Sequence, residues 1–351
     1  MGIVNEMKTI VIDGEVLCTD RMDGIHRFMI EILSRVDKLI EGKDIRLQII
    51  HSKGKSLKNI TLKNIEEVEL ACKSRGMRFR AVPAYVKSVD GIYCSMSNDS
   101  ICYRNSIITV MDLIPLSPLA CYPLKSLLRM KLVYARMKKY GRRFVTISET
   151  SKNDMVQKLG IKEKDITIVG TGYEHMNRIQ DTDDVFTRNS SIRRHEYYYA
   201  VGNQYPYKNF EWVRQAAKRN PDSQFVVAGN VTNIDKPVDD SDSNIIYLGY
   251  ISDEDNKALM KNAKAFIHPS KLEGFGIPPL EALSQGTEVI IARASCLPEI
   301  YGDTAHYIDP DDYDVNLEEL VQEEVTSPEK LLKKYSWDNV ARDWLKIFEE
   351  A

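Results

Sequence analysis

The chain has 351 residues, of which 43% are hydrophobic and 28% charged, and its formal net charge is -3. This length exceeds the usual size of one domain, so we expect two domains of ordinary size. The composition is typical of a globular protein, no apolar run approaches the length needed to span a bilayer, and we expect no nucleic-acid partner.

Cysteine usage and charge distribution add two constraints. The six cysteines include no C-x-x-C pair, which argues against a zinc site and a disulfide scaffold, and no signal-peptide pattern is present, so we expect a cytoplasmic location. Residues 1–190 carry 31 Lys+Arg and 23 Asp+Glu, a balance of +8, whereas residues 191–351 carry 17 and 28, a balance of -11. The two halves therefore differ in electrostatic character, and the first is expected to meet something anionic.

The first half alternates short apolar runs with helical patterns. A helix is predicted from residue 24 onward, with Asp23 as its N-cap and apolar residues at helical spacing. Strands are predicted at Lys8–Asp13, Ile45–Ile50, Ile65–Leu70, Ile92–Met96, Ile107–Met111 and Arg143–Ile147. This alternation indicates a doubly wound α/β domain, and Asp112 lies at a strand end, where such domains place their active groups.

A basic segment, KSLLRMKLVYARMKKYGRR, covers residues 125–143. It contains eight Lys or Arg residues, no acid and several interleaved apolar residues. That pattern suits the surface of an anionic membrane, although a core helix with a solvated basic face would have the same sequence pattern. Lys73, Arg75, Arg78 and Arg80 are further bases that favour the membrane interpretation.

A polar stretch divides the halves. Residues 181–191, DTDDVFTRNSS, read as a linker or loop, and the preceding Gly170-x-Gly172 lacks the third glycine of a dinucleotide fingerprint because His175 stands there. The alternation of predicted strands and helices begins again at EYYYAVG. Lys208 then lies in a strand-to-helix turn, where a lysine can hold a diphosphate but is often merely solvated.

The stretch AFIHPSKLEGFGIPPLEALSQG predicts a strand, a loop and a helix that begins near Pro278 and Pro279. Glycines in the loop allow close backbone approach, and the helix start offers free N–H groups to an anion. Glu273 and Glu281 bracket this position. Carboxylates beside an anion suit a ligand that also carries hydroxyls, although a helix-dipole role for Glu281 and a solvated Glu273 remain open.

The Glu-x7-Glu spacing in EGFGIPPLE, the following ALSQG and Glu299 in LPEIYGD resemble the family 4 retaining glycosyltransferases of the GT-B fold. The resemblance implies two doubly wound Rossmann-like domains facing across a cleft. An acceptor-binding domain is expected over residues 1–180 and a donor-binding domain over 190–330. A terminal helix over 331–351 would return to the first domain.

The resemblance also implies roles for individual residues. Glu273, Lys208 and Asp112 are expected to be catalytic, with Lys208 on the donor diphosphate. The substrate-binding residues are expected to be Gly24, Lys208, Gly274, Phe275, Gly276, Ile277 and Glu281, the last on the ribose. Met111 stands where the family commonly has His, and Tyr207 where it has Arg.

The expected reaction is retaining transfer of a hexose-type sugar from a nucleotide-sugar to a glycan or lipid-linked acceptor in cell-surface polysaccharide synthesis. No cofactor is expected. Acidic clusters at residues 181–183, 239–242 and 309–314 lie in polar loops, so no metal is expected either. Two alternatives stay open: a GT-B-type sugar-nucleotide epimerase, and a non-catalytic nucleotide-sugar-binding subunit. Peripheral contact with the inner face of the plasma membrane is a further expectation.

Overall fold

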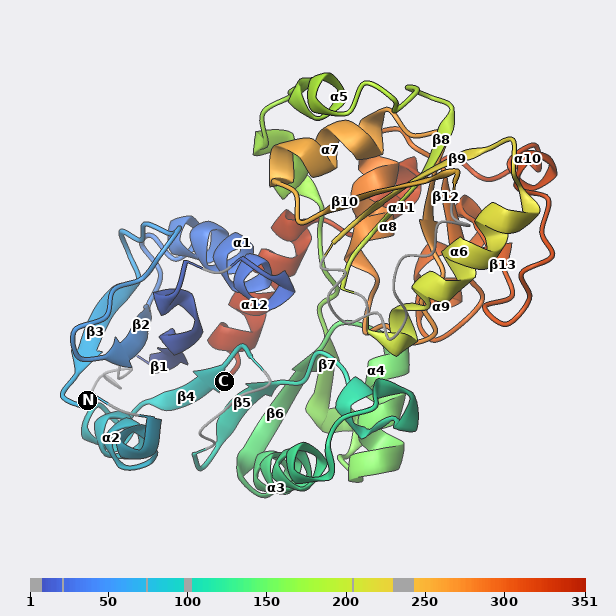
Figure 1. The fold of residues 1–351 in the computed structure, drawn as a ribbon. Coiled ribbons are helices and arrows are strands. Elements are labelled where there is room, and N and C mark those ends of the chain that lie inside the picture. The colour runs from blue at the N-terminus through green and yellow to red at the C-terminus, as the bar shows by residue number, and fades with distance from the viewer. Residues whose placement is uncertain (1–7, 21, 74, 98–102, 204, 230–242) are drawn as a thin grey trace. The chain divides into compact units, whose positions relative to one another are not determined.

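The computed structural model describes residues 8–20, 22–73, 75–97, 103–203, 205–229 and 243–351 (Figure 1). The chain divides into two compact units. Unit 1 contains the described residues up to Leu113 together with Pro123–Thr171 and Trp337–Ala351. Unit 2 contains Ile114–Tyr122 and the described residues of Gly172–Ser336.

Unit 1 is built on a seven-stranded sheet whose order is β3-β2-β1-β4-β5-β6-β7, with every neighbouring pair parallel. Because the chain starts in the middle and winds outward in both directions, the sheet is doubly wound. Its strands are β1 (Lys8–Asp13), β2 (Ile45–Ser52), β3 (Glu66–Leu70), β4 (Ile92–Ser95), β5 (Ser106–Thr109), β6 (Gly141–Thr146) and β7 (Ile166–Ile168). The sequence prediction anticipated the first six and omitted β7, which is only three residues long.

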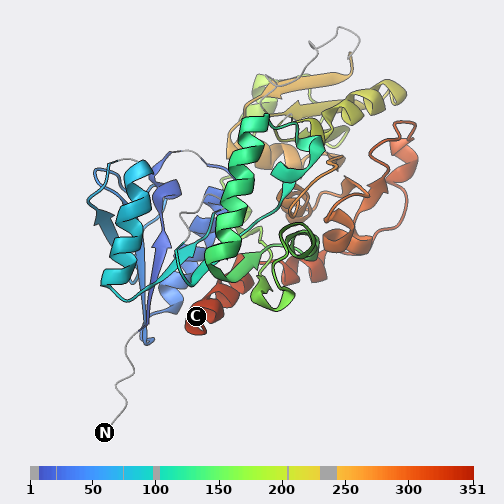
Figure 2. The same cartoon turned by 90° about the horizontal axis from the view of Figure 1, so that it is seen from below.

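Helices cover both faces of this sheet. They are α1 (Gly24–Leu39), α2 (Arg75–Ser88), α3 (Leu124–Tyr140), α4 (Glu149–Asp154) and α12 (Trp337–Glu349). Figure 1 shows α1 and α12 on one face and α2 and α3 on the other, and Figure 2 shows α2 and α3 in front of the strands. The central strands β1, β4 and β5 are therefore buried on both faces, which explains their nearly continuous apolar sequences. Strand β3 at the sheet edge, EEVEL, is mostly exposed.

The last helix packs in unit 1 because of its apolar face. Trp337 and Trp344 are fully buried and meet the ring of Phe28 on α1 edge-on, with centroids 6.1 and 6.4 Å away. Arg35 of α1 donates from Nε to Asp338 at 2.6 Å. An aromatic face of this size would be costly to leave in water, so it fixes the helix to α1.

Unit 2 repeats the architecture with a six-stranded parallel sheet of order β10-β9-β8-β11-β12-β13. The strands are β8 (Tyr197–Val201), β9 (Gln224–Ala228), β10 (Ile245–Gly249), β11 (Ala265–His268), β12 (Val289–Ala292) and β13 (His306–Ile308). The helices are α5 (Asp184–Arg188), α6 (Phe210–Arg219), α7 (Asp253–Lys261), α8 (Ile277–Ser284), α9 (Leu297–Tyr301), α10 (Leu317–Leu320) and α11 (Glu329–Lys334).

Strand β8 shows how both faces of this second sheet are covered. Tyr198 donates its hydroxyl to Glu318 of α10 at 3.0 Å, whereas Tyr197 and Tyr199 donate to main-chain and side-chain oxygens of α7, each at 2.7 Å. Alternate residues of a strand point to opposite faces, so α10 and α7 lie on opposite sides of the sheet. The predicted doubly wound α/β class is thus confirmed for both halves of the chain.

Candidate functional site

The loop between β11 and α8 has the conformation that the sequence predicted. Helix α8 begins at Ile277, with Gly276 as its N-cap in the left-handed region at φ 84°. A Cβ at Gly276 would lie 2.6 Å from Leu297 Cδ2, so no larger residue fits there without displacement. Tyr301 donates its hydroxyl to the Gly276 carbonyl and accepts from the Leu280 N–H, which fixes this turn. Pro278 and Pro279 have no N–H, so the first helical turn offers at most the Ile277 N–H to a ligand.

Glu273 lies at the centre of a buried polar cluster. Its Oε1 accepts from Lys208 Nζ at 2.6 Å and from His268 Nε2 at 2.6 Å, and its side chain is 9% exposed. Burial raises the pKa of Glu273, but the charges of Lys208 and His268 outweigh it and hold that pKa well below its usual range. The carboxylate is therefore ionised and acts only as an acceptor, not as a proton donor.

Lys208 is held near this loop by the turn that carries it. Asn209 follows with φ 59°, and its buried side-chain amide donates to the carbonyls of Pro269 at 3.2 Å and Pro310 at 2.8 Å. The Lys208 ammonium also lies 5.7 Å from the centre of the Tyr207 ring, which stacks on Tyr205. An ammonium has three donors, so the one used on Glu273 leaves others for an anion.

Glu281, one turn into α8, has a buried partner of its own. Its Oε1 accepts from His175 Nε2 at 2.7 Å, and the two side chains are 12% and 2% exposed. Both Glu273 and Glu281 act on the buried hydroxyl of Tyr301, whose pKa is raised first by burial and then by neighbouring negative charges. The two carboxylates predicted from the Glu-x7-Glu spacing therefore belong to one region of unit 2.

The other predicted site residues lie as follows. Gly274 and Ile277 flank the turn, and the Phe275 side chain is buried edge-on against Tyr335 at 5.0 Å, so only its main chain is available to a ligand. Gly24 and Asp112 lie in unit 1. Gly24 is the first residue of α1, and Asp112 is half-buried three residues after β5.

Two histidines at this site were not assigned a role from the sequence. His268 is the last residue of β11 and lies five residues before Glu273. Its position at a strand end, close to the predicted loop, was a sequence signal that could have identified it as a site residue. His175 lies 106 residues before Glu281, and no local pattern connects them. Both imidazoles donate to a predicted site carboxylate, and so fix its orientation.

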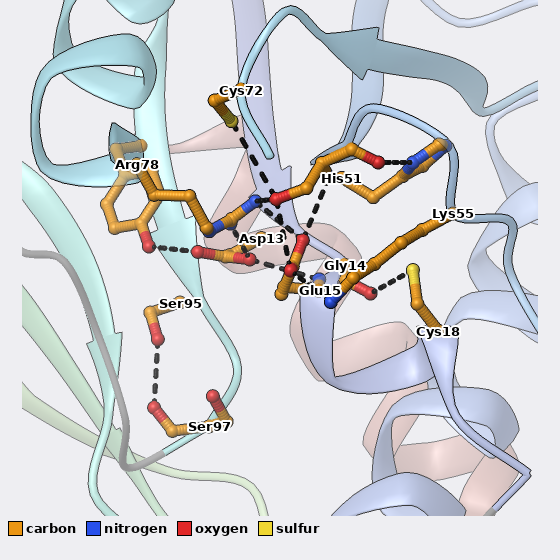
Figure 3. Close-up of polar contacts among 12 residues, drawn as sticks. Asp13, Gly14, Glu15, Cys18, His51, Lys55, Cys72, Arg78, Ser95 and Ser97 are labelled. Atoms are coloured by element: carbon orange, nitrogen blue, oxygen red, sulfur yellow. Dashed lines mark hydrogen bonds and ion pairs between the residues drawn. The ribbon is translucent and has the colours of Figure 1, made fainter. Parts of the chain in front are cut away.

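Unit 1 has a separate polar network at the carboxyl ends of β1, β2 and β4 (Figure 3). Arg78, 3% exposed, donates to Asp13 at 2.5 Å and to Glu15 at 2.7 Å, and Tyr93 donates its hydroxyl to Asp13 at 2.7 Å. The inclusion of Arg78 among bases available to a membrane was wrong. Its guanidinium is buried because two carboxylates compensate its charge.

Glu15 ties this network to β2. It accepts from the Ser52 main-chain N–H at 2.9 Å and from Lys55 Nζ at 2.7 Å. Burial raises the pKa of Glu15, but the bonds from Lys55 and Ser52 and the charge of Arg78 lower it by more. Because each carboxylate oxygen of Glu15 already has donors within the chain, we infer that this network has a structural role and stabilises the strand ends.

The acidic loops show no metal site among the residues that the structure describes: no group of three or more His, Cys, Asp and Glu side chains is placed to hold an ion. Asp181 forms ion pairs with Lys257 at 2.9 Å and Lys261 at 3.0 Å, and Asp311 pairs with Lys271. The predicted cluster at residues 239–242 lies outside the described residues. Within the described part of the chain, no helix combines the length and the apolar character needed to cross a bilayer.

Comparisons with known proteins place this geometry in context. Residues 182–335 match the family described as "Glycosyl transferases group 1". The O-antigen chain mannosyltransferase B of Escherichia coli is 35% identical over 114 residues, which is 30% of each chain. The O-antigen chain mannosyltransferase RfbU of Salmonella typhimurium is 26% identical over 260 residues, or 69% of each. The chain thus aligns with less than a third of the first relative's length and about two thirds of the second's.

Solved structures resemble the whole fold. HepE of Anabaena, solved in complex with UDP-glucose, has a TM-score of 0.69 and 12% identity, covering 98% of this chain and 100% of that one. The lipopolysaccharide outer core galactosyltransferase WaaB has a TM-score of 0.67 and 14% identity over the same shares. At these identities the likeness concerns the fold.

Proposed function

We propose that this chain, which belongs to the group 1 glycosyltransferases of the GT-B fold, moves a hexosyl group from a nucleotide-sugar to a glycan or lipid-linked acceptor in cell-surface polysaccharide synthesis. The observation that carries the proposal is the Lys208–Glu273–His268 cluster at the start of α8. This cluster and the adjacent helix start combine a lysine and a main-chain N–H, which suit an anion, with the ionised Glu273 carboxylate, which accepts from hydroxyls. A nucleotide-diphosphate sugar offers all of these complementary groups.

The roles proposed for the residues follow from their chemistry. Lys208 and the main-chain N–H of Ile277, at the start of α8, hold the diphosphate and stabilise its charge as it leaves. Glu281, oriented by His175, accepts from the ribose hydroxyls. Glu273 and the main chain of residues 274–277 position the sugar. Asp112 and Gly24, which lie in unit 1, remain the proposed catalytic and substrate-binding residues of that unit, respectively.

Retention of configuration is the proposed stereochemical outcome. Glu273 is engaged by two donors, Lys208 and His268, which makes it a poor nucleophile, so we favour attack on the same face from which the leaving group departs. The bond between the anomeric carbon and the phosphate oxygen breaks and a bond to the acceptor oxygen forms. The acceptor's proton passes to the departing diphosphate. The protein contributes orientation and charge stabilisation, without metal or cofactor.

Mannose is the first donor sugar to test, because the two O-antigen relatives are named mannosyltransferases. The decisive experiment measures binding and product formation with GDP-mannose, UDP-glucose and UDP-galactose, each with and without a glycan acceptor. Product that requires both donor and acceptor supports the proposal. Sugar conversion from donor alone would favour the epimerase, and binding without turnover would favour the non-catalytic subunit.

We also propose that unit 1 docks on an anionic membrane through α3. Leu124, Leu128 and Leu132, spaced four residues apart on one side of the helix, are 72%, 55% and 68% exposed. Met137, which the sequence pattern placed among the interleaved apolar residues, is instead fully buried. An exposed leucine row between basic side chains suits the interface of an anionic bilayer, where a lipid-linked acceptor would be reached.

A further inference from the structure

A basic pocket lies at the amino edge of the first sheet, where β5, β6 and β7 begin. Its volume is about 570 Å³, and three segments line it: residues 104–105 before β5, residues 139–142 around the end of α3, and residues 162–165 before β7. The strands are parallel, so this edge is opposite to the one where Asp13 ends β1 and Asp112 follows β5. The pocket is thus separate from the proposed active edge of unit 1.

Five cationic side chains converge on this pocket against one carboxylate, that of Asp165: Arg104, Lys139, Arg142, Lys162 and Lys164. All five are exposed, and none forms an ion pair in the part of the chain that the structure describes. Their neighbours behave differently. Arg143 pairs with Glu350 at 3.1 Å, and Lys152 pairs with Glu163 at 2.9 Å, so acids are present nearby but are used elsewhere.

An ordinary structural role accounts for only part of this pattern. A base in the last turn of a helix complements the helix dipole, and Lys139 at the end of α3 fits that role. The other four cations come from outside the helix. The Lys139 ammonium also lies 5.2 Å from the centre of the Tyr140 ring. Charges of one sign that converge without acidic partners repel one another, and a concave wall concentrates their field on any anion that enters.

We propose that the basic pocket binds a compact ligand bearing phosphate groups, at a site distinct from that for the sugar donor. Arginine forks and lysine ammonium groups are the side chains that match phosphate oxygens best. The volume is within the range of small-molecule sites. The ligand is either a soluble polyphosphate or the phosphate headgroups of lipids. The inference rests on the pocket alone and does not require the proposed reaction.

The test uses the full chain and inorganic pyrophosphate as the probe, with binding measured by isothermal titration calorimetry at low salt. Lys162→Glu combined with Lys164→Glu should weaken pyrophosphate binding by about tenfold or more, since charge-assisted contacts become repulsive. The matched control is Lys58→Glu with Lys63→Glu. It reverses two exposed lysines of the same unit away from the pocket, and affinity should stay within about twofold.

A Lys208→Ala variant separates this pocket from the proposed donor site, and it should retain binding at the basic pocket. A second arm measures co-sedimentation with vesicles that contain phosphatidylglycerol. Attachment that the Lys162→Glu/Lys164→Glu variant loses identifies lipid headgroups as the ligand. Pyrophosphate binding without such attachment identifies a soluble ligand. The inference is overturned if the Lys162→Glu/Lys164→Glu variant binds both probes as the unmodified chain does, if the control pair lowers binding equally, or if Lys208→Ala alone abolishes it.

Discussion

Replacing Lys208 by alanine tests the site through two separate consequences. The substitution removes an ammonium 2.6 Å from Glu273 Oε1, in a pair whose side chains are 19% and 9% exposed. It should weaken donor binding, because a charge-assisted contact with the diphosphate is lost. It should also destabilise the fold, because the buried Glu273 carboxylate then keeps His268 as the remaining side-chain donor to Oε1 in the described structure.

The magnitudes of these two effects differ. Loss of one charge-assisted hydrogen bond is worth about 1.5–3 kcal/mol, or roughly ten- to hundredfold in donor affinity. Removal of one partner of a buried ion pair costs about 3–5 kcal/mol in folding stability. His268 still donates to the same oxygen, so we expect a loss of stability at or below the lower end of that range.

A double-mutant cycle separates the loss of donor affinity from the loss of folding stability. Glu273→Gln removes the charge that Lys208 neutralises, so adding it to Lys208→Ala should recover much of the lost stability without restoring donor affinity. Stability is measured by urea unfolding and affinity by titration with the active nucleotide-sugar. Lys271→Ala is the control, because Lys271 lies in the same loop but pairs with the exposed Asp311, and its loss should cost at most about 1 kcal/mol.

Two results would refute this reasoning. Wild-type donor affinity in Lys208→Ala would remove the lysine from the site. Recovery of that affinity by Glu273→Gln would mean that the lysine acts only by neutralising the carboxylate, not by holding the diphosphate.

The remaining predictions concern the other parts of the molecule. Glu281→Ala should weaken donor binding by about ten- to hundredfold while His175→Ala has a smaller effect, and titration should rank them in that order. Activity should persist in EDTA, and complete loss reversed by magnesium or manganese would contradict the metal-free mechanism. Because Glu273 has a pKa below its ordinary 4.5 in the folded protein, its stabilising contribution is present above pH 4.5 and is lost as pH falls toward the folded-state pKa; Glu273→Gln should flatten that part of the urea-stability profile. Leu128→Glu with Leu132→Glu should abolish binding to anionic vesicles at low salt, and an unchanged bound fraction would exclude α3 as the docking surface, with Leu39→Ser on α1 as the control.

Local sequence was enough to predict much of the fold. Short runs separated by helical patterns indicated six of the seven strands of unit 1. The central strands are buried on both faces and have nearly continuous apolar sequences, whereas the edge strand β3, EEVEL, does not. The start of α8 followed from Pro278, Pro279 and the glycine before them, since those residues restrict the backbone directly. Resemblance of the Glu-x7-Glu spacing to a family supplied the rest of the site prediction, and its residue roles remain to be tested.

Tertiary structure alone decided which charges are paired. Arg78 appeared in the sequence as one of several exposed bases, but contacts with Asp13, 65 residues away, bury it. His175 reaches Glu281 across 106 residues, and the basic pocket joins three separate segments. Periodicity and turn chemistry report on neighbours within a few residues, whereas the state of a charged group depends on burial and on partners that only the folded chain brings within a few ångströms.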